Sequence, residues 1–463
     1  MKKITFILGL ILFFILESTA QFSQTVTSAD GLSLLKHIAK PLLLSDQFNQ
    51  LTSKDTVFID EDMQYQKIEG FGYTLTGGSA TLLHQMSQDK RRVILKEIFG
   101  QESNALNVNY LRISIGASDL DAMVFSYDDL KEGEVDPDLT KMSIAPDQAY
   151  LIPILKEIQT IQPGLKLMAS PWSPPVWMKD NGKSKGGHLL TKYYKSYAQY
   201  FVKYIQLMRA AGITINAVTI QNEPEHGGNN PSMLMTAAEQ TAFIKNHLGP
   251  AFKKQGILTE IVIWDHNADN PNYSIQILND SVAKSFVTAS AFHLYLGHES
   301  ALSKVHQAHP DKKIYFTEQW TGAKGSFAGD FMWHMEHIVI GTMANWSSLV
   351  LEWNLANDPT YGPHTPGGCT ECLGALTIAG SDLKRNVSYY IIGQVAPFIP
   401  AGSTRIQTKS SDAQIKSIGF KRPDGKKVLV ALNTGKECVY TINFKQQEYH
   451  FSLPEKSAST IVW

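Results

Sequence analysis

The chain has 463 residues, 43% hydrophobic and 18% charged, so it can bury a large core and is neither a disordered nor a fibrous chain. Lysine and arginine total 42 against 43 aspartate and glutamate, and no long basic run is present to follow a nucleic-acid backbone. The composition therefore favours a neutral substrate and argues against a nucleic-acid partner.

The first 20 residues have the pattern of a signal peptide. Lys2 and Lys3 form a basic start, an apolar stretch covers residues 4–16, and Ser18 and Ala20 are small residues near a plausible cleavage point. The alternative is a membrane anchor, but the stretch is shorter than the ~20 residues that span a bilayer. We expect a secreted or periplasmic protein, with no stable membrane insertion after signal removal.

From residue 67 to 398 the chain alternates short apolar or β-branched runs with helical patterns, which indicates successive βα units and a parallel sheet. Eight runs lie at residues 67–75, 109–115, 165–170, 216–222, 260–266, 290–295, 313–318 and 347–353. Apolar residues recur at helical spacing in 87–100, 147–161, 193–212 and 238–256. Gly100, Gly212 and Gly256 end three of these patterns, where a left-handed residue is often needed.

Eight strands with eight crossovers favour a closed (β/α)8 barrel of ~250 residues or more, although a doubly wound open sheet gives the same alternation. What favours the barrel is the position of the polar and aromatic residues. They gather at the C-terminal ends of the runs, where barrel enzymes place their chemistry. They are Asn222, Glu223, His266, His293, Tyr295, Glu318 and Trp353.

After residue 398 the pattern changes to short alternating strands, with Asp424-Gly425 as a turn between two of them. Residues 21–66 also lack long helical periodicity and are expected to join the same β-domain. We therefore divide the chain into a signal peptide (1–20), an N-terminal part of the β side domain (21–66), the barrel (67–398) and a C-terminal part of the side domain (399–463). The predicted fold class is α/β, a TIM barrel with a discontinuous all-β side domain.

Glu223 and Glu318 are the candidate catalytic pair. Hydrolysis of a glycoside with retention needs two carboxyl groups ~5 Å apart, one ionised to attack the anomeric carbon and one protonated to assist the leaving group. Both follow strand ends, at the fourth and seventh positions of the barrel, although either alone can equally be a loop residue, a helix cap or an ion-pair partner. Pro224 is expected to keep Glu223 in an extended backbone, and the Glu318 charge to raise its pKa. Glu225, beyond the proline, is expected to be solvated.

The predicted mouth is also rich in groups that suit a sugar. Sugar pockets combine aromatic platforms with polar donors and acceptors, because sugar rings have apolar faces and hydroxyl edges. Each tryptophan taken singly is as readily a packing residue. The tryptophans that follow or flank strand ends are Trp172, Trp177, Trp320, Trp346 and Trp353.

Arg112 and Asp119 bracket the segment RISIGASD after the second run. They are either a structural ion pair, or the arginine orients the nucleophile and lowers its pKa. The amide of Asn222 can hydrogen-bond the sugar 2-hydroxyl, a contact that strengthens in the transition state.

Three cysteines occur: Cys369 and Cys372 form a CxxC, and Cys438 is alone. A zinc site needs more ligands at closed spacing, so a small loop disulfide suits an exported chain better, with a reduced pair as the alternative. No HExxH, GxSxG or phosphate-loop motif is present, and the DHN at 265–267 is too short a signal for a metal. We expect no catalytic metal and no cofactor.

Together these motifs resemble glycoside hydrolase family 30, which includes lysosomal glucosylceramidase and β-1,6-glucanases. The matching segments, in the family's order along most of the chain, are IEGFGYTLTGGSA, LRISIGASD, ASPWSPPVWMK, TIQNEPEH, AFHLY, YFTEQW and LEWNLA. The resemblance implies a barrel with a side β-domain built from both chain ends. It further implies that Glu223 is the acid/base, Glu318 the nucleophile and Asn222 the partner of the 2-hydroxyl. Implied glucose-binding residues are Arg112, Asp119, Trp172, His293, Tyr295 and Trp353, to which the mouth position adds Trp320.

The loop at 358–376 departs from the glucosylceramidase branch and looks closer to the β-1,6-glucanase branch. We therefore expect a retaining β-glycosidase that hydrolyses β-1,6-glucan or a related β-glucan by two-glutamate double displacement. The alternatives are a glucosylceramidase acting on a glycolipid and, in another class, a non-catalytic carbohydrate-binding protein. The sequence does not indicate the oligomeric state or whether cleavage is endo or exo.

Overall fold

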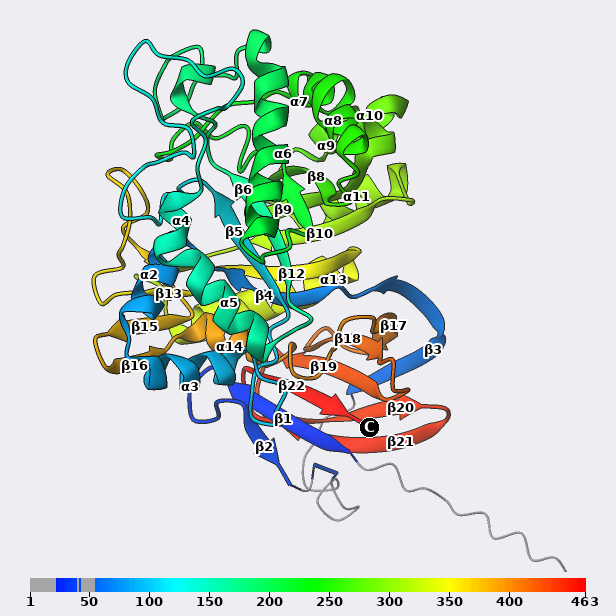
Figure 1. Ribbon diagram of the computed structural model, residues 1–463. Coiled ribbons are helices and arrows are strands. Elements are labelled where there is room, and N and C mark those ends of the chain that lie inside the picture. Colours follow the sequence, from blue (N-terminus) through cyan, green and yellow to red (C-terminus); the bar gives the residue numbers. More distant parts are fainter. Residues whose placement is uncertain (1–21, 40, 43–54) are drawn as a thin grey trace, which may run out of the picture.

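The structure is a computed structural model that describes residues 22–39, 41–42 and 55–463. It contains a closed barrel of eight strands and a separate nine-stranded sheet, so the predicted fold class is confirmed (Figure 1). The predicted signal peptide lies outside the described residues. Within those residues, no helix has both the length and the apolar character needed to cross a membrane.

Each of the eight predicted runs overlaps a strand of the barrel, and the strands follow one another around it in chain order. They are β4 (Gly70–Thr74), β5 (Tyr110–Ile115), β6 (Lys166–Pro171), β7 (Ala217–Thr219), β8 (Glu260–Ala268), β9 (Val287–Gly297), β10 (Lys313–Glu318) and β12 (Ser347–Asn354). The last strand, β12, pairs in parallel with both β10 and β4. This pairing closes the ring and rules out the open-sheet alternative.

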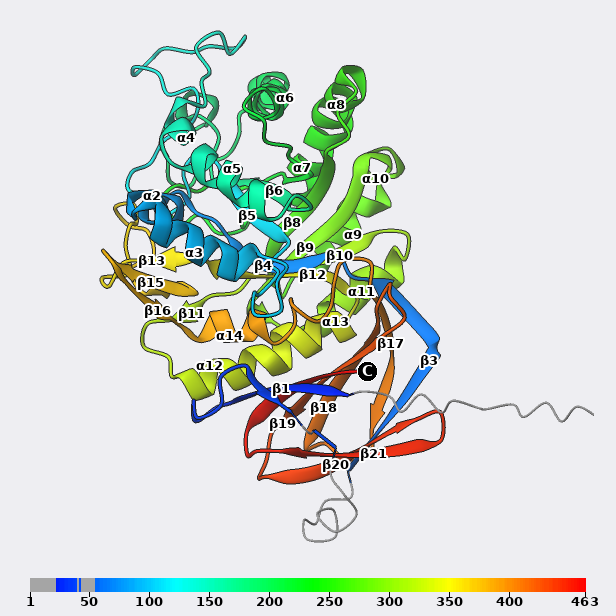
Figure 2. The same cartoon turned by 60° about the horizontal axis from the view of Figure 1, so that its bottom comes forward.

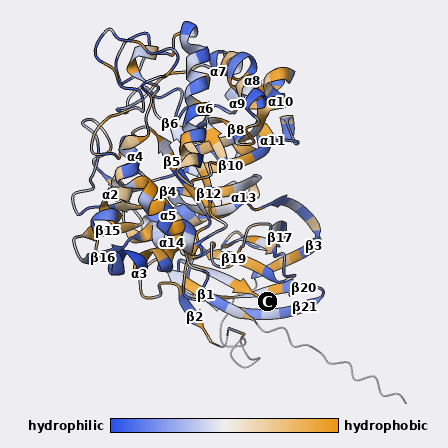
Figure 3. Cartoon of the chain, viewed as in Figure 1, coloured by the Kyte–Doolittle hydropathy of each residue, from blue (hydrophilic) through white to orange (hydrophobic). Residues whose placement is uncertain are grey.

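Helices surround the barrel, as the two views in Figures 1 and 2 show. Their apolar residues face inward: in α6, Phe201 and Ile205 are buried whereas Gln206 and Arg209 are exposed, and Figure 3 shows the same mixture of hydrophobic and hydrophilic residues along the helices. The helices are α2 (Gly77–Gln85), α3 (Gln88–Phe99), α4 (Ala145–Ala149), α5 (Leu151–Ile161), α6 (Tyr194–Ala210), α7 (Ala237–Phe243), α8 (Gly249–Gln255), α9 (Pro271–Asn279), α10 (Ser281–Phe286), α11 (Ser300–Ala308), α12 (Phe327–Trp333), α13 (Thr342–Ala344) and α14 (Val387–Gly393). Two π-helical segments, η3 (Ile244–Leu248) and η4 (His334–Gly341), join α7 to α8 and α12 to α13.

Three glycines were expected to have a left-handed backbone at helix ends, and two of them do. Gly212 has φ +85° and Gly256 has φ +61°. The expectation was wrong for Gly100, whose φ is −62°. That residue has another reason to be glycine, because a Cβ there would lie 2.3 Å from the carbonyl oxygen of Lys96.

The side sheet is built from both ends of the chain, in the order β2-β1-β22-β19-β18-β17-β3-β20-β21. Its strands are β1 (Ser23–Ser28), β2 (Lys36–Ile38), β3 (Asp55–Lys67), β17 (Thr404–Ser410), β18 (Ile415–Lys421), β19 (Lys427–Asn433), β20 (Cys438–Phe444), β21 (Gln447–Leu453) and β22 (Ser457–Val462). Strands β1 and β22 pair antiparallel along their whole length and lie side by side, in blue and red, in Figure 1. The predicted turn at Asp424-Gly425 joins β18 to β19, with Gly425 at φ +86°.

Short strands also occur in the loops at the C-terminal end of the barrel. They are β11 (Thr321–Gly322), β13 (Ala356–Asn357), β14 (Cys372–Leu373), β15 (Leu376–Ala379) and β16 (Asp382–Arg385). Strand β11, just after β10, pairs with β14 in the loop that follows β12. This pairing fastens the loop of the two cysteines to the mouth of the barrel.

Candidate active site

A pocket of about 390 Å³ lies at the C-terminal mouth of the barrel. It is lined by Asp119, Trp172, Glu223, His226, Asn229, His266, Asn267, Tyr295, Leu296, Glu318, Trp320, Trp353, Cys369 and Cys372. A larger hollow of about 960 Å³ lies between α3 and α5. That hollow does not contain the candidate glutamates, so the smaller pocket is the candidate active site.

The two predicted glutamates meet in this pocket. A carboxylate oxygen of Glu223, one of Glu318 and a ring nitrogen of His293 all lie within 4.8 Å of one another. Both glutamates are buried, at 8% and 5% exposure. Carboxyl groups ~5 Å apart suit a double displacement, in which one carboxylate attacks directly, and are too close for the 6.5–9.5 Å arrangement that admits a water in an inverting site.

Glu318 is held by a donor on each carboxylate oxygen. It is the last residue of β10, and Arg112 on β5 donates to its Oε2 from Nη1 at 2.6 Å. The hydroxyl of Tyr295 donates to its Oε1 at 3.0 Å. These contacts fix the direction of the carboxylate toward the pocket.

Arg112 is completely buried and donates to four side chains, one of which is Ser170, whose Oγ accepts from Nε at 3.1 Å. Besides Glu318, its Nη2 donates to Asn222 Oδ1 at 2.6 Å and to Asp265 Oδ2 at 2.8 Å. Its guanidinium lies 4.8 Å from the ring centre of Trp172. The alternative of an Arg112–Asp119 ion pair is therefore wrong, because the partners of the arginine are Glu318 and Asp265.

The backbone at Glu223 differs from the expectation. Strand β7 ends at Thr219, and Glu223 has φ +46°, so it is left-handed rather than extended. Its N–H donates to the carbonyl of Asp265 at 3.0 Å, and its own carbonyl accepts from the N–H of His226 at 2.9 Å. These two bonds hold a tight turn, whereas Pro224 disfavours only the right-handed helical region for the preceding residue.

A line of three side chains runs through the pocket floor. His293 Nδ1 lies 3.1 Å from Glu223 Oε1, and His293 Nε2 lies 3.2 Å from Asp265 Oδ1. The same Asp265 oxygen accepts from the hydroxyl of Thr317 at 2.7 Å. Asp265 thus orients His293, and His293 faces the acid/base candidate.

The ionisation of this cluster also differs from the expectation. Burial raises the pKa of Glu223, but the hydrogen bond and the charge of His293 outweigh it, so the pKa is lowered; the predicted increase caused by Glu318 is wrong. Burial raises the pKa of Glu318, and His293 and Arg112 both oppose the increase; Arg112 thus acts in the predicted direction, but burial outweighs it. Burial opposes the protonation of His293, yet Glu318, Asp265 and Glu223 raise its pKa to about 9.

These pKa shifts bear on the two protons of the His293 imidazole. Burial opposes ionisation of Asp265, but mainly the Arg112 charge lowers the pKa of Asp265, so it accepts from His293 Nε2–H. The second proton, on Nδ1, faces Glu223 across 3.1 Å. Glu223 and His293 are therefore placed to share one transferable proton.

We expect His293 to make the stability of the protein depend on pH. A raised histidine pKa stabilises the fold fully below the ordinary value of 6.5, and this stabilisation is lost as the pH rises through about 9. Urea unfolding of the wild type at pH 6 to 10 should show this decline, and His293→Asn should reduce it. His298→Asn, at an exposed histidine, is the control, and an unchanged slope in His293→Asn would contradict the assignment.

Asp119 presents an unpartnered acceptor to the pocket. Its Oδ2 accepts from the N–H of Cys369 at 3.3 Å, but its buried Oδ1 has no hydrogen-bond partner. Burial, reinforced by the charge of Glu318, raises the pKa of Asp119 to about 7. A buried carboxylate oxygen without a donor is costly, which suits a site that a ligand hydroxyl completes.

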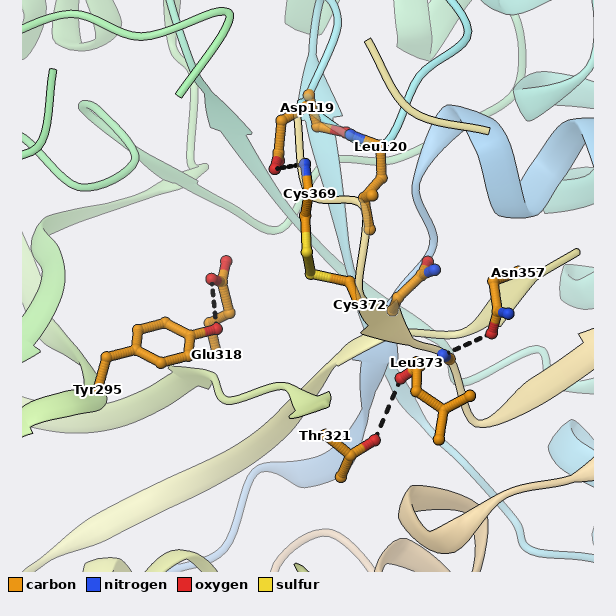
Figure 4. Close-up of a disulfide and its surroundings, with 12 residues drawn as sticks. Asp119, Leu120, Tyr295, Glu318, Thr321, Asn357, Cys369, Cys372 and Leu373 are labelled. Atoms are coloured by element: carbon orange, nitrogen blue, oxygen red, sulfur yellow. Dashed lines mark hydrogen bonds between the residues drawn. A yellow bond between two sulfur atoms is a disulfide. The ribbon is translucent and has the colours of Figure 1, made fainter. Parts of the chain in front are cut away.

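The aromatic wall and the two cysteines form one cluster. The rings of Trp172 and Trp353 meet at 5.5 Å, and Trp320 packs against the same cluster. Cys369 and Cys372 form a disulfide that lines the pocket, so the bridged alternative holds. Figure 4 shows the bridge between the Asp119–Cys369 contact and the Tyr295–Glu318 pair.

Three other residues that the sequence pointed to lie outside the pocket. Glu225 is exposed, as expected, and contacts Asn270. Trp177 donates to Asp128 and does not line the pocket. Trp346 is not at the mouth, because it precedes β12 at its N-terminal end and stacks on His306 at 3.7 Å.

The main residue that sequence reasoning missed is Asp265. It follows the apolar residues of β8, and this position is the feature of the sequence that could have identified it as a site residue. Its φ of +62° and an irregularity in the pairing between Trp264 and His266 mark a bulge that turns it toward Arg112. His266 and Asn267, the other two residues of the DHN segment, line the pocket beside it.

The site suits proton transfer better than metal binding. Among the described residues, the group that could hold a cation is Glu223, His293 and Glu318. Both ring nitrogens of His293 already face carboxylates, and Arg112 occupies one oxygen of Glu318. Two close carboxyl groups, a shared proton and an aromatic wall are the parts of a double displacement at a sugar.

Comparisons with known proteins agree with this chemistry. The model of the glycosyl hydrolase family 30 TIM-barrel domain matches residues 68–399, and that of the glycosyl hydrolase family 30 beta sandwich domain matches residues 402–461. An endo-1,6-beta-D-glucanase of Aspergillus fumigatus is 33% identical over 443 residues, covering 89% of this chain and 87% of that one. The lysosomal acid glucosylceramidase of Mus musculus is 26% identical over 406 residues, covering 82% and 78%. The solved structure of an endo-beta1,6-glucanase superposes with a TM-score of 0.87 at 32% identity, covering 96% of this chain and all of that one.

Proposed function

This chain belongs to glycosyl hydrolase family 30, and from that premise we propose that it cleaves β-1,6-glucan internally, with retention of configuration, by means of Glu318 and Glu223. It is a glycoside hydrolase with a carbohydrate substrate. The single observation that carries the mechanism is the 4.8 Å grouping of the two carboxylates with His293. The choice of glucan rests on the endo-1,6-glucanases, which are more similar to this chain than the mouse glucosylceramidase is.

In the first step, a carboxylate oxygen of Glu318 attacks the anomeric carbon. The bond from that carbon to the glycosidic oxygen breaks, and Glu223 delivers a proton to the departing oxygen. His293 supplies this proton to Glu223 across 3.1 Å, since the two groups share it. The step leaves a glucosyl ester on Glu318 and a free hydroxyl on the leaving chain.

In the second step, Glu223 acts as a base. It takes a proton from water while the water oxygen attacks the anomeric carbon and the ester bond to Glu318 breaks. Arg112 and Tyr295 stabilise the carboxylate that reappears, because each donates a hydrogen bond to it. Two inversions give overall retention.

The glucose bound during both steps contacts the pocket walls. Asp119 accepts from a sugar hydroxyl through its unpartnered Oδ1. Asn222, held by Arg112, presents its amide to the 2-hydroxyl. The remaining contacts are to the rings of Trp172, Trp320, Trp353 and Tyr295, which line the pocket. His293 lies behind Glu223 and is fully buried.

Incubation with β-1,6-glucan and with glucosylceramide, in parallel, tests the substrate. We expect oligosaccharides of mixed length from the glucan, with the β-anomer formed first by NMR. Release of ceramide alone would favour the glucosylceramidase alternative. Binding of glucan without turnover would favour a carbohydrate-binding protein.

We also propose that the protein is secreted or periplasmic, where such a polymer is accessible. This proposal rests on residues 1–20, which would be absent from the mature protein.

Glu223→Ala is expected to lower kcat/KM for the glucan by about 10²–10⁴-fold, because an alkoxide is a poor leaving group without an acid. Formation of the glucosyl enzyme from 2,4-dinitrophenyl β-glucoside should fall much less, since that leaving group needs no proton. Azide should restore turnover and give the β-glucosyl azide. Equal losses on both substrates, without azide rescue, would exclude Glu223 as the acid/base.

Removal of the disulfide is expected to raise KM more than it lowers kcat. In the Cys369→Ser/Cys372→Ser variant the N–H that holds Asp119 is no longer fixed, so KM for an aryl β-glucoside should rise about tenfold with a smaller change in kcat. Cys438→Ser, at the free buried cysteine of β20, controls for the loss of a cysteine. An unchanged KM would limit the bridge to a structural role.

A further inference from the structure

A second cavity, of about 470 Å³, lies beside the catalytic pocket. The two share Tyr295 and Trp320 as walls. The second cavity extends from these residues to α12 and to Glu371, in the loop of the disulfide. The two cavities are therefore neighbours on either side of Tyr295 and Trp320.

The far wall of this second cavity is Trp333, the last residue of α12. This residue is 38% exposed, and it is the tryptophan among the exposed large hydrophobic residues of the described chain. Contacts with the rings of His334 and His337, at 5.3 Å and 5.1 Å, hold it in place. An ordered, exposed indole next to an active site offers a flat face to the C–H groups of a sugar ring.

The near wall carries a polar group without a partner. Gln319 follows the nucleophile and is 6% exposed, yet its side-chain Oε1 has no hydrogen-bond partner. Its backbone carbonyl accepts from the N–H of Trp353 at 2.8 Å, so its position is set by the catalytic strands. A buried amide oxygen that lacks a donor is costly, and a hydroxyl group in the cavity would satisfy it.

The rest of the cavity favours a neutral polar ligand. Lys324 and Glu371 form an ion pair at the rim, so these two charges compensate each other. The other carboxyl group of the lining is Asp330, whose pKa is raised by burial against the opposing effect of His334. The wall between the pockets is fixed by the pairing of β11 with β14, where Thr321 Oγ1 donates to Leu373 O at 3.1 Å, as Figure 4 shows. Aromatic faces, an unpaired amide oxygen and a carboxyl group at Asp330 that can accept from a hydroxyl describe a site for a sugar ring.

We propose that this second cavity is a subsite for a further glucosyl unit of the glucan chain, with Trp333 as its platform and Gln319 as a hydroxyl acceptor. The inference rests on the proposed function and deepens it. A subsite beyond the catalytic pocket makes cleavage depend on chain length, which distinguishes a polymer-degrading enzyme from one that recognises a single glucose.

The test compares Trp333→Ala, Trp333→Phe and the wild type on β-1,6-linked glucose oligomers of two to six units and on 4-nitrophenyl β-glucoside. We expect Trp333→Ala to lower the ratio of kcat/KM for the longest oligomer to that for the aryl glucoside about tenfold. Trp333→Phe should recover most of the ratio, because it keeps a flat ring. Tyr150→Ala, at a tyrosine that is 41% exposed and lines neither cavity, is the matched control.

Calorimetry on the inactive Glu318→Gln protein, with and without Trp333→Ala, measures the same subsite without turnover. The longer oligomers should bind about tenfold more weakly when Trp333 is absent. An unchanged ratio with unchanged affinity, in a wild type that cleaves the glucan, overturns the subsite alone. A wild type that neither cleaves nor binds the oligomers overturns the proposed function and the subsite with it.

Discussion

Glu318→Gln is expected to lower kcat on a β-glucan or an aryl β-glucoside by about 10⁴-fold or more, because the amide cannot form the glucosyl ester. A 2-fluoroglucoside with a good leaving group should label the wild type covalently and leave the variant unlabelled. Mass spectrometry of the intact protein and of its peptides would place the label on Glu318.

The fold should survive this change. Glutamine has the shape of glutamate, and Arg112 keeps Asp265 as an ionic partner at 2.8 Å. Glu225→Gln, an exposed neighbour of the acid/base, is the matched control and should retain wild-type activity. A Glu318→Gln protein that still turns over at the wild-type rate, or is still labelled at another carboxylate, would remove Glu318 from the nucleophile role.

The second large effect is expected at Arg112. Arg112→Leu leaves the carboxylates of Glu318 and Asp265 buried without their cation, and losing one partner of a buried ionic network costs about 3–5 kcal/mol. The free energy of unfolding, measured in urea, should fall by that amount. Activity should fall as well, since the nucleophile loses the donor to its Oε2.

Arg112→Lys should not rescue this loss. One ammonium cannot reach Glu318, Asn222 and Asp265 in the directions that the guanidinium does, and a lysine does not stack on Trp172 in the same way. Arg422→Lys, in a partly exposed ion pair on the turn after β18, is the control and should change stability by less than about 1 kcal/mol. Equal effects at both arginines would mean that Arg112 is not a central ionic contact.

The barrel could be predicted because its strands are buried on both sides. Such strands appear as continuous apolar runs, and each of the eight runs overlaps its strand. The strand end at Glu318 was equally visible, because the apolar residues of β10 stop there. The proposed division of the chain at 66/67 and 398/399 follows the same change in pattern and remains a proposal.

The details of the site depend on geometry that a linear pattern does not contain. Asp265 enters the pocket through a bulge, which places two left-handed residues next to each other in β8. Arg112 pairs with carboxylates 153 and 206 residues away rather than with the nearby Asp119. The pKa of Glu223 depends on His293, whose contact with it exists only once β7 and β9 are in place.

The predicted position of Trp346 at the mouth was wrong for a different reason. Its proximity to a strand suggested the mouth, but it precedes β12 and so lies at the other end of the barrel, where Arg405 is 5.4 Å from its ring. The direction of the strand, not the residue type, decides which tryptophans can face a substrate.

The pairing of β1 with β22 bears on the order in which the protein is completed during synthesis. β1 has two neighbours, the short β2 and β22, and β22 connects it to β19 and the rest of the sheet. A growing chain that has not yet reached Ser457 contains every barrel strand but leaves β1 without its main partner. The pairing of β1 with β22 therefore has to follow the synthesis of residues 457–462, so the side sheet is completed only after all eight barrel strands have been made.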